Sequence, residues 1–197
     1  MKTKTKSGNV GYAVVGLGRG MDHVRCASNS KNCDLLAVCD INPETFKKLE
    51  GKYEADTYTD IDEMLKRDDI DIVSICTPSG THAELAMKVA EAGKHAMLEK
   101  PFDITLDKID ATVKAFADKG LKLGLIFQNR FAPANRKAKQ LIDEGVLGDL
   151  ILGVVQVKWY RTQGYYDANG GWRGTWAMDG GGSLMNQGIH TVDLFQW

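Results

Sequence analysis

Over the first two thirds of the chain, short apolar runs typical of strands alternate with segments whose apolar residues have helical spacing. Short apolar runs, rich in β-branched residues, predict strands that are buried on both faces of a parallel sheet. These runs cover residues 12–15, 35–39, 70–76, 95–98 and 121–127, with a shorter one at 57–59. Between them, helical spacing predicts helices at 61–65, from 82 to a stop at Gly93, and at 106–117. Strands that alternate with helices predict an α/β fold with a doubly wound parallel sheet.

From Phe131 the pattern changes and predicts the start of a second α/β domain. We expect an amphipathic helix at 132–145, a long strand at 150–160, a loop dense in Gly, Tyr and Trp at 161–182, and an apolar helix from about 183 onwards. A single long strand would leave an uncovered apolar edge, and the last helix has no glycine cap. We therefore expect this second domain to be truncated.

Composition narrows the classes of function. The chain is 43% hydrophobic and 26% charged, which is typical of a globular protein with a substantial core. Its net charge is −1 and its basic residues are scattered, so no nucleic-acid or membrane partner is expected. Residues 1–9 are expected to be a disordered tail, because no apolar segment follows that would make them a signal peptide.

The cysteines point to a compartment. Cys26, Cys33, Cys39 and Cys76 show no C-x-x-C spacing, and two of them fall in predicted strands. This arrangement is typical of buried free thiols in a reducing compartment. We therefore expect a cytoplasmic protein.

Glycines and an acid in the first part of the chain indicate a dinucleotide-binding unit. An apolar run leads into Gly16-Leu17-Gly18-Arg19-Gly20, and a second apolar run ends in Asp40, 24 residues after Gly16. Glycine lets the backbone approach a pyrophosphate, the following helix offers free N–H groups, and the acid can bind a ribose diol. A carboxylate at position 40 repels a 2′-phosphate, so NAD is expected rather than NADP.

The third glycine of the usual G-x-G-x-x-G pattern should fall at position 21, which is Met21. Either the loop is one residue shorter, with Gly20 in that place, or Gly20 has another role and Met21 lies where helix and strand pack closely. A glycine-rich turn without a ligand is the alternative, although the strand, the helix and Asp40 disfavour it.

Glu99-Lys100-Pro101 follows the fifth predicted strand, at the end where such sheets bind ligands. Proline favours an extended geometry at Lys100 and so fixes the direction of its side chain. A partly desolvated lysine loses its proton more easily and can exchange it with a hydroxyl near neutral pH. A solvated lysine in a surface turn is the alternative.

Three polar residues share one face of the last predicted helix. Asn186, His190 and Asp193 are spaced i, i+4 and i+7. His190 is suited to proton transfer at neutral pH, and Asp193 could orient its ring; a histidine satisfied within the core is the alternative. A metal site is disfavoured because no third ligand lies at suitable spacing.

Aromatic residues and arginines crowd the loop at 161–182. Tyr165, Tyr166, Trp172 and Trp176 lie among Arg161 and Arg173. Such residues can stack on a sugar or base and donate paired hydrogen bonds to a phosphate or carboxylate. The alternative is that the aromatics pack the loop onto its own domain. Of the other histidines, His82 begins a helix beside the expected cofactor, whereas His23 and His95 look structural.

Together these features resemble the Gfo/Idh/MocA family of oxidoreductases. The matching residues are the GLGRG loop, Asp40, Thr77-Pro78 with His82, Glu99-Lys100-Pro101, Gln128-Asn129-Arg130-Phe131, and Gly180-Gly181-Gly182 followed by His190. The resemblance implies a Rossmann domain at 10–130 and, at 131–197, the first part of an α/β domain whose sheet covers the nicotinamide. It also implies a homo-oligomer for a full-length protein.

The resemblance assigns roles by position, with no metal among them. Cofactor contacts are implied for Gly16, Gly18, Arg19, Gly20, Asp40, Thr77, Pro78, His82, Glu99, Lys100 and Gln128. Substrate contacts are implied for Lys100, Arg161, Trp172, Arg173, Asn186 and His190, and proton transfer for Lys100 and His190. Many family members have Asp where this chain has Asn186, and a neutral amide cannot act as a base.

The expected function is hydride transfer between a sugar or nucleotide-sugar alcohol and NAD. The run from Trp172 to Gln187 looks most like the branch that oxidises the 3-hydroxyl of UDP-N-acetylglucosaminuronate. The alternative is a truncated, non-catalytic protein that binds NAD or senses a sugar.

Overall fold

The computed structural model describes residues 8–197, which form two compact units. The first ends at Leu125 and the second runs from Ile126 to Trp197. Residues 1–7 of the expected tail lie outside the described residues. No helix in the described part of the chain is long and apolar enough to cross a membrane.

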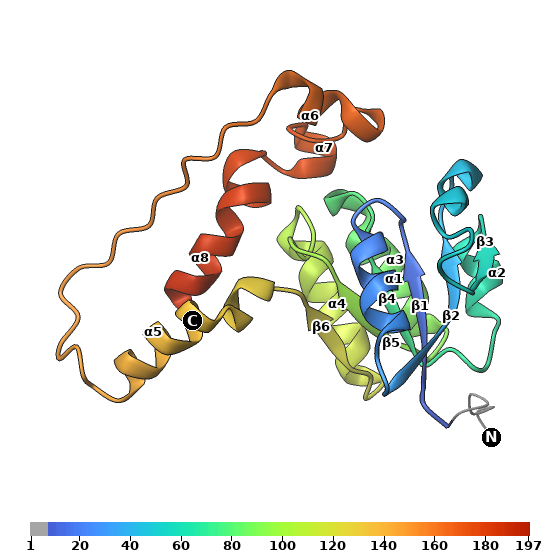
Figure 1. The fold of residues 1–197 in the computed structure, drawn as a ribbon, viewed down its shortest axis with the longest axis horizontal. Helices are drawn as coiled ribbons and strands as arrows, with labels where there is room; N and C mark the ends of the chain where they lie inside the picture. The colour runs from blue at the N-terminus through green and yellow to red at the C-terminus, as the bar shows by residue number, and fades with distance from the viewer. Residues whose placement is uncertain (1–7) are drawn as a thin grey trace. The chain divides into compact units, whose positions relative to one another are not determined.

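A six-stranded parallel sheet forms the centre of the first unit (Figure 1). Its strands are β1 (Val10–Val15), β2 (Cys33–Cys39), β3 (Asp56–Tyr58), β4 (Ile72–Ile75), β5 (His95–Leu98) and β6 (Leu123–Leu125). They lie in the order β3-β2-β1-β4-β5-β6. The order reverses between β1 and β4, which is the crevice where doubly wound sheets bind ligands. The expected Rossmann-type α/β fold is confirmed.

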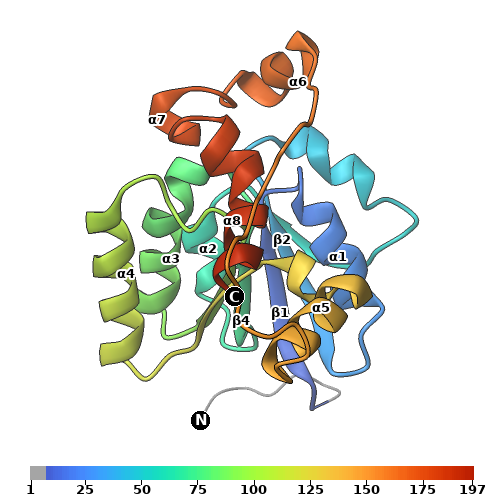
Figure 2. The ribbon, with the colours of Figure 1, turned by 90° about the vertical axis from the view of Figure 1, so that its left-hand side faces the viewer.

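Helices cover both faces of this sheet (Figure 2). One face carries α1 (Gly20–Ser28) and a 3₁₀ helix, η1 (Pro43–Lys48), and the other carries α2 (Ile61–Leu65), α3 (His82–Glu91) and α4 (Leu106–Asp118). Val14 and Val24 are fully buried on the first face, and Ile75, Val89 and Phe116 on the second. Two apolar layers therefore fix the strand ends that carry the candidate site.

Most first-unit predictions agree with the observed elements to within a few residues. The largest differences lie at the strands predicted for 70–76 and 121–127, which shorten to Ile72–Ile75 and Leu123–Leu125. The shortest predicted strand, 57–59, moves by one residue to Asp56–Tyr58. Apolar periodicity reports burial, which extends beyond the paired residues of each strand.

The second unit is helical in the described residues. It contains η3 (Gln128–Phe131), α5 (Pro133–Asp143), α6 (Gln163–Asp167), η4 (Ala168–Gly170), α7 (Trp176–Asp179), a π-helical turn η5 (Ser183–Gly188) and α8 (Ile189–Gln196). The loop predicted at 161–182 therefore includes two short α-helices. The last predicted helix begins with the π-helical turn, and only its second part is α-helical.

The strand predicted at 150–160 is wrong for this structure. Residues 150–160 belong to no helix or strand, and Figure 1 shows them as part of a long extended trace. Ile151 and Leu152 are 96% and 82% exposed. The apolar and β-branched pattern reports a preference for extended backbone, but a strand also needs a neighbour, and the described part of the second unit provides none.

Candidate functional site

The glycine loop between β1 and α1 has the geometry that a pyrophosphate requires. Gly16 has φ of +86°, and a side chain there would meet the carbonyl oxygen of Cys76 at 2.8 Å. A Cβ at Gly18 would meet nothing within 4 Å. The loop therefore turns sharply at its first glycine and leaves open space at its second, where a phosphate can approach the backbone.

Gly20 performs the packing role of the third glycine. It is the first residue of α1, and a Cβ there would lie 2.8 Å from Val14 Cγ1 and 3.3 Å from Cys76 Cβ. Helix α1 thus contacts β1 and the end of β4 closely only because position 20 has no side chain. The loop is one residue shorter than usual, and Met21 is partly buried against the same apolar layer.

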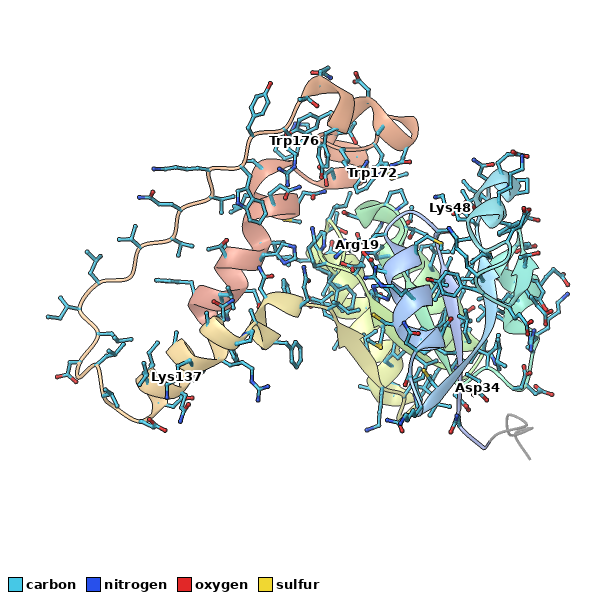
Figure 3. All side chains as sticks on the ribbon, viewed as in Figure 1. Arg19, Asp34, Lys48, Lys137, Trp172 and Trp176 are labelled. Atoms are coloured by element: carbon cyan, nitrogen blue, oxygen red, sulfur yellow. The ribbon has the colours of Figure 1, made fainter. Side chains whose placement is uncertain are left out.

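Asp40 follows β2 and is tied to the glycine loop. Its Oδ2 accepts a hydrogen bond from the Leu17 backbone N–H at 2.7 Å, and its Oδ1 accepts one from Asn42 N–H at 2.9 Å. Lys48, at the end of η1, donates to the Leu17 carbonyl oxygen at 2.9 Å. Figure 3 shows Lys48 and Arg19 near this loop. Asp40, which would hold the adenosine ribose, and the glycine loop, which would hold the pyrophosphate, are therefore joined by hydrogen bonds.

The loop after β4 carries Thr77, Pro78 and His82. The Gly16 position lies against Thr77, whose methyl group would be 3.0 Å from a Cβ on that glycine. His82 is 1% exposed, and its ring nitrogens lie 2.8 Å from the carbonyl oxygens of Thr77 and Pro101. The His82 ring thus joins the loops after β4 and β5, and its two nitrogens are engaged by backbone.

The loop after β5 carries Glu99 and Lys100, and the peptide bond between Lys100 and Pro101 is cis. Glu99 is 8% exposed, with Oε1 3.1 Å from His23 Nε2 and Oε2 accepting from the Lys100 backbone N–H at 3.2 Å. Burial alone would raise the pKa of the Glu99 carboxyl, but the hydrogen bond and charge of His23, with the charge of Arg19, hold this pKa below its usual value. A Glu99 carboxylate is therefore stable at neutral pH.

The polar face predicted on the last helix is present in the second unit. Asn186, His190 and Asp193 are each 7–8% exposed. The Phe127 ring meets His190 edge-on, with ring centroids 6.4 Å apart. Both Asp193 oxygens accept from Arg130, at 2.8 and 2.5 Å. Asp193 thus forms a paired contact with Arg130, whose planar geometry suits guanidinium and carboxylate. The orienting role of Asp193 for His190 stays a prediction.

Asp179 is a buried carboxylate for which the sequence predicts no role. It is 1% exposed, with Oδ1 accepting from the Asn186 side-chain amide at 2.5 Å and Oδ2 from the Gly174 N–H at 2.7 Å. Because a carboxylate only accepts, Asn186 must direct its NH₂ group to Asp179. The sequence feature that could have indicated a role for Asp179 is its position directly before Gly180-Gly181-Gly182.

The arginines of the aromatic segment stack on Tyr165. The guanidinium carbons of Arg161 and Arg173 lie 5.2 and 4.9 Å from its ring centroid, and Arg173 also lies 4.8 Å from the Trp172 ring. Gln187 donates to the Tyr165 hydroxyl at 2.8 Å. Two cations are therefore held together in the second unit. Trp176 is 83% exposed, and Figure 3 shows it on the same segment as Trp172.

The candidate residues divide between the two units. The first unit brings together the glycine loop and the ends of β2, β4 and β5, with Gly16, Gly18, Arg19, Gly20, Asp40, Thr77, Pro78, His82, Glu99 and Lys100. The second carries Gln128, Arg161, Trp172, Arg173, Asn186 and His190. Within residues 8–197, no three His, Cys, Asp or Glu side chains are grouped so as to hold a metal ion.

The sheet order, the open glycine loop and the acid at the end of β2 define a dinucleotide-binding protein of the Rossmann class. The family described as "Oxidoreductase family, NAD-binding Rossmann fold" matches residues 10–127, and the Gfo/Idh/MocA C-terminal domain matches residues 135–197. The chain belongs to the Gfo/Idh/MocA family, and its cofactor is NAD.

Individual relatives support the same assignment. An inositol 2-dehydrogenase from Rhizobium meliloti is 35% identical over 72% of this chain and 43% of its own length. A D-glucoside 3-dehydrogenase from Escherichia coli is 31% identical over 98% of this chain and 55% of its own. The WlbA dehydrogenase from Bordetella pertussis, crystallised with NADH and UDP-GlcNAcA, has a TM-score of 0.90 at 34% identity, covering 96% of this chain and 55% of that one. The chain thus spans about half the length of these relatives.

Proposed function

We propose that the protein is an NAD-dependent oxidoreductase that acts on a secondary alcohol of a sugar or nucleotide sugar. The observation that carries this proposal is the open glycine loop of a Gfo/Idh/MocA Rossmann domain, beside a loop that presents Lys100. When bound, NAD supplies the acceptor for the hydride that leaves the alcohol carbon. The chain's own residues bind the cofactor, orient the alcohol and take its proton.

Cofactor binding is assigned to the ends of β1, β2, β4 and β5. The backbone at Gly18 and the first turn of α1 can donate to a pyrophosphate, and Arg19 adds a positive charge. Asp40 can accept from the ribose hydroxyls and repels the 2′-phosphate of NADP. Gln128, at the start of the second unit, is an additional contact.

Proton transfer is assigned to Lys100 and His190. Either can accept the hydroxyl proton as the carbon–hydrogen bond breaks, and a lysine ammonium can stabilise negative charge on the oxygen. Asn186, held by Asp179, can hold a substrate hydroxyl but not remove its proton.

A nucleotide sugar fits the second unit best. Arg161 and Arg173 hold two positive charges beside aromatic rings, which suits a diphosphate or uronate carboxylate next to a base or sugar. The similar WlbA dehydrogenase was crystallised with UDP-GlcNAcA, so oxidation of UDP-N-acetylglucosaminuronate at its 3-hydroxyl is the specific reaction that we propose. We also propose a cytoplasmic homo-oligomer for the full-length protein.

A non-catalytic protein that binds NAD or senses a sugar is the second candidate. The observation that favours it is that the first unit alone carries the open glycine loop and Asp40, so that NAD binding does not require the residues of the second unit that are proposed for catalysis. Both candidate functions use the same NAD site, but only the oxidoreductase converts an alcohol.

One assay separates the candidates. NADH formation is followed with inositols, glucosides and UDP-sugars, including UDP-N-acetylglucosaminuronate, and NAD affinity is measured by calorimetry in parallel. We expect NAD binding and turnover of at least one alcohol, with UDP-N-acetylglucosaminuronate the best. NAD binding without turnover of any alcohol would favour the sensing protein, and absence of NAD binding would contradict both candidates.

A further inference from the structure

A series of hydrogen bonds links β4, α1 and the loop after β5 in the first unit. Ser74 on β4 lies with its hydroxyl 2.6 Å from Nδ1 of His23, and His23 Nε2 lies 3.1 Å from Glu99 Oε1. The other Glu99 oxygen accepts from the backbone N–H of Lys100 at 3.2 Å. These hydrogen bonds therefore connect the sheet, through His23 of α1, to Lys100, the residue proposed to transfer a proton.

The donors and acceptors in this hydrogen-bond network are consistent with one another, because the Glu99 carboxylate only accepts and His23 presents a ring nitrogen to it. His23 Nε2–H donates to Glu99, and Glu99 accepts a second hydrogen bond from the Lys100 backbone N–H. Nδ1 of His23 shares a hydrogen bond with the Ser74 hydroxyl, which can donate or accept. The His23 and Glu99 side chains are each 10% exposed, so little water competes for these contacts. Hydrogen bonds in such a dry site hold their geometry better than surface contacts do.

The residue types match those of a hydrolytic Ser–His–acid triad, but the burial excludes that role. Ser74 is 0% exposed, inside the central strand β4. A nucleophile must reach its substrate, and this hydroxyl has no access to one. The contacts of His23 instead hold protein elements together.

We propose that His23 is a positioning residue that fixes the Glu99–Lys100 loop against the helix that follows the glycine loop. Without the imidazole, Glu99 Oε1 would lose its hydrogen-bond partner and keep only the Arg19 guanidinium, whose Nε lies 3.7 Å away. The Glu99 carboxylate could then turn away from the Lys100 N–H. Lys100 would then sample several positions relative to the cofactor loop. A displacement of about 1 Å can cost a catalytic group roughly a hundredfold in rate. The catalytic part of this inference rests on the role proposed for Lys100.

The test compares three variants of the protein. His23→Ala removes the link, and His23→Gln restores a side-chain N–H that can reach Glu99. His95→Ala is the matched control, because His95 is also partly buried, accepts a backbone hydrogen bond, from Lys122, and lies at the opposite end of β5 from Glu99. Amide hydrogen exchange of Lys100 is followed by NMR with isotope-labelled lysine, and kcat and KM are measured with the best substrate.

We expect His23→Ala to speed exchange of the Lys100 amide on the order of tenfold and to lower kcat by about tenfold to a hundredfold with a smaller change in KM. His23→Gln should recover a large part of the slow Lys100 exchange and of kcat. His95→Ala should change neither the Lys100 exchange nor kcat. Unchanged Lys100 exchange in His23→Ala would overturn the proposal, even if kcat falls. If the wild type turns over no substrate, the proposed function fails, whereas the exchange measurement still decides whether His23 holds the loop.

Discussion

At the scale of single residues, the glycines at 18 and 20 have separate tasks although they are two positions apart. Gly20 allows α1 to contact Val14 and Cys76, whereas Gly18 faces open space. One position therefore serves packing and the other serves ligand approach.

Alanine substitutions should separate these tasks. Gly20→Ala places a Cβ 2.8 Å from Val14 Cγ1, and overpacking of this kind costs roughly 1–3 kcal/mol. Gly18→Ala should leave the free energy of unfolding nearly unchanged and weaken NAD binding, since its Cβ occupies the open space. Urea denaturation and calorimetry with NAD measure the two effects. A destabilised Gly18→Ala, or a Gly20→Ala as stable as the wild type, would contradict these assignments.

The four thiols should react at different rates. Burial raises the pKa of Cys39 and of Cys76 to about 12, whereas Cys26 is exposed on α1. At pH 8 the two buried residues carry almost no thiolate, which is the reactive form. We expect Cys26 to react first with a thiol reagent and Cys39 and Cys76 to react only as the protein unfolds. Mass spectrometry of labelled peptides gives the order, and early labelling of Cys76 would contradict it.

The positions of side chains in the fold were predictable where one residue type at one place in a motif decides them. Gly16 and Asp40 follow from the motif, and their places in the structure agree with it. Partners distant in sequence were not predictable: the sequence indicates a structural role for His23 but not that it contacts Ser74 and Glu99. The expectation of buried thiols holds for Cys39 and Cys76 but not for Cys26, which is exposed on α1, or for Cys33, which is only partly buried.

At the scale of elements, the segment at 150–160 is the main departure from the sequence prediction. Its apolar side chains are exposed and no strand pairs with it in the described residues. Extended apolar backbone of this kind is a template for pairing with another chain. Sequence predicts the extended backbone correctly but cannot provide a neighbouring strand.

We therefore expect the 197-residue chain to self-associate through this segment. Ile151→Lys combined with Val155→Lys should shift the protein toward the monomer, because charges on a strand edge oppose pairing. Gln156→Lys, which adds one positive charge at a polar position of the segment, is the control, and its effect should be less than half that of the double variant. Light scattering after size-exclusion chromatography measures the mass. A wild-type monomer at all concentrations would contradict this prediction.

At the scale of the whole molecule, the proposed functions divide between the two units. Every proposed cofactor contact except Gln128 belongs to the first unit, which has its own two apolar layers. The second unit carries His190 and the stacked arginines. A domain with its own core can fold alone.

A fragment of residues 1–127 should therefore fold and bind NAD without catalysing turnover. We expect cooperative thermal unfolding by circular dichroism and an NAD dissociation constant within roughly tenfold of the whole chain, a difference of about 1.4 kcal/mol. An unfolded fragment would show that the first unit depends on the second, and turnover by the fragment would contradict the role of His190.

The most direct measurement is the rate of NADH formation by Lys100→Ala beside its affinity for NAD. Loss of a positioned proton acceptor should lower kcat by on the order of a hundredfold or more, while the dissociation constant for NAD should stay within about threefold, since the glycine loop and Asp40 are unchanged. A variant that keeps the full wild-type rate would show that Lys100 takes no part in the chemistry and would contradict the proposed mechanism.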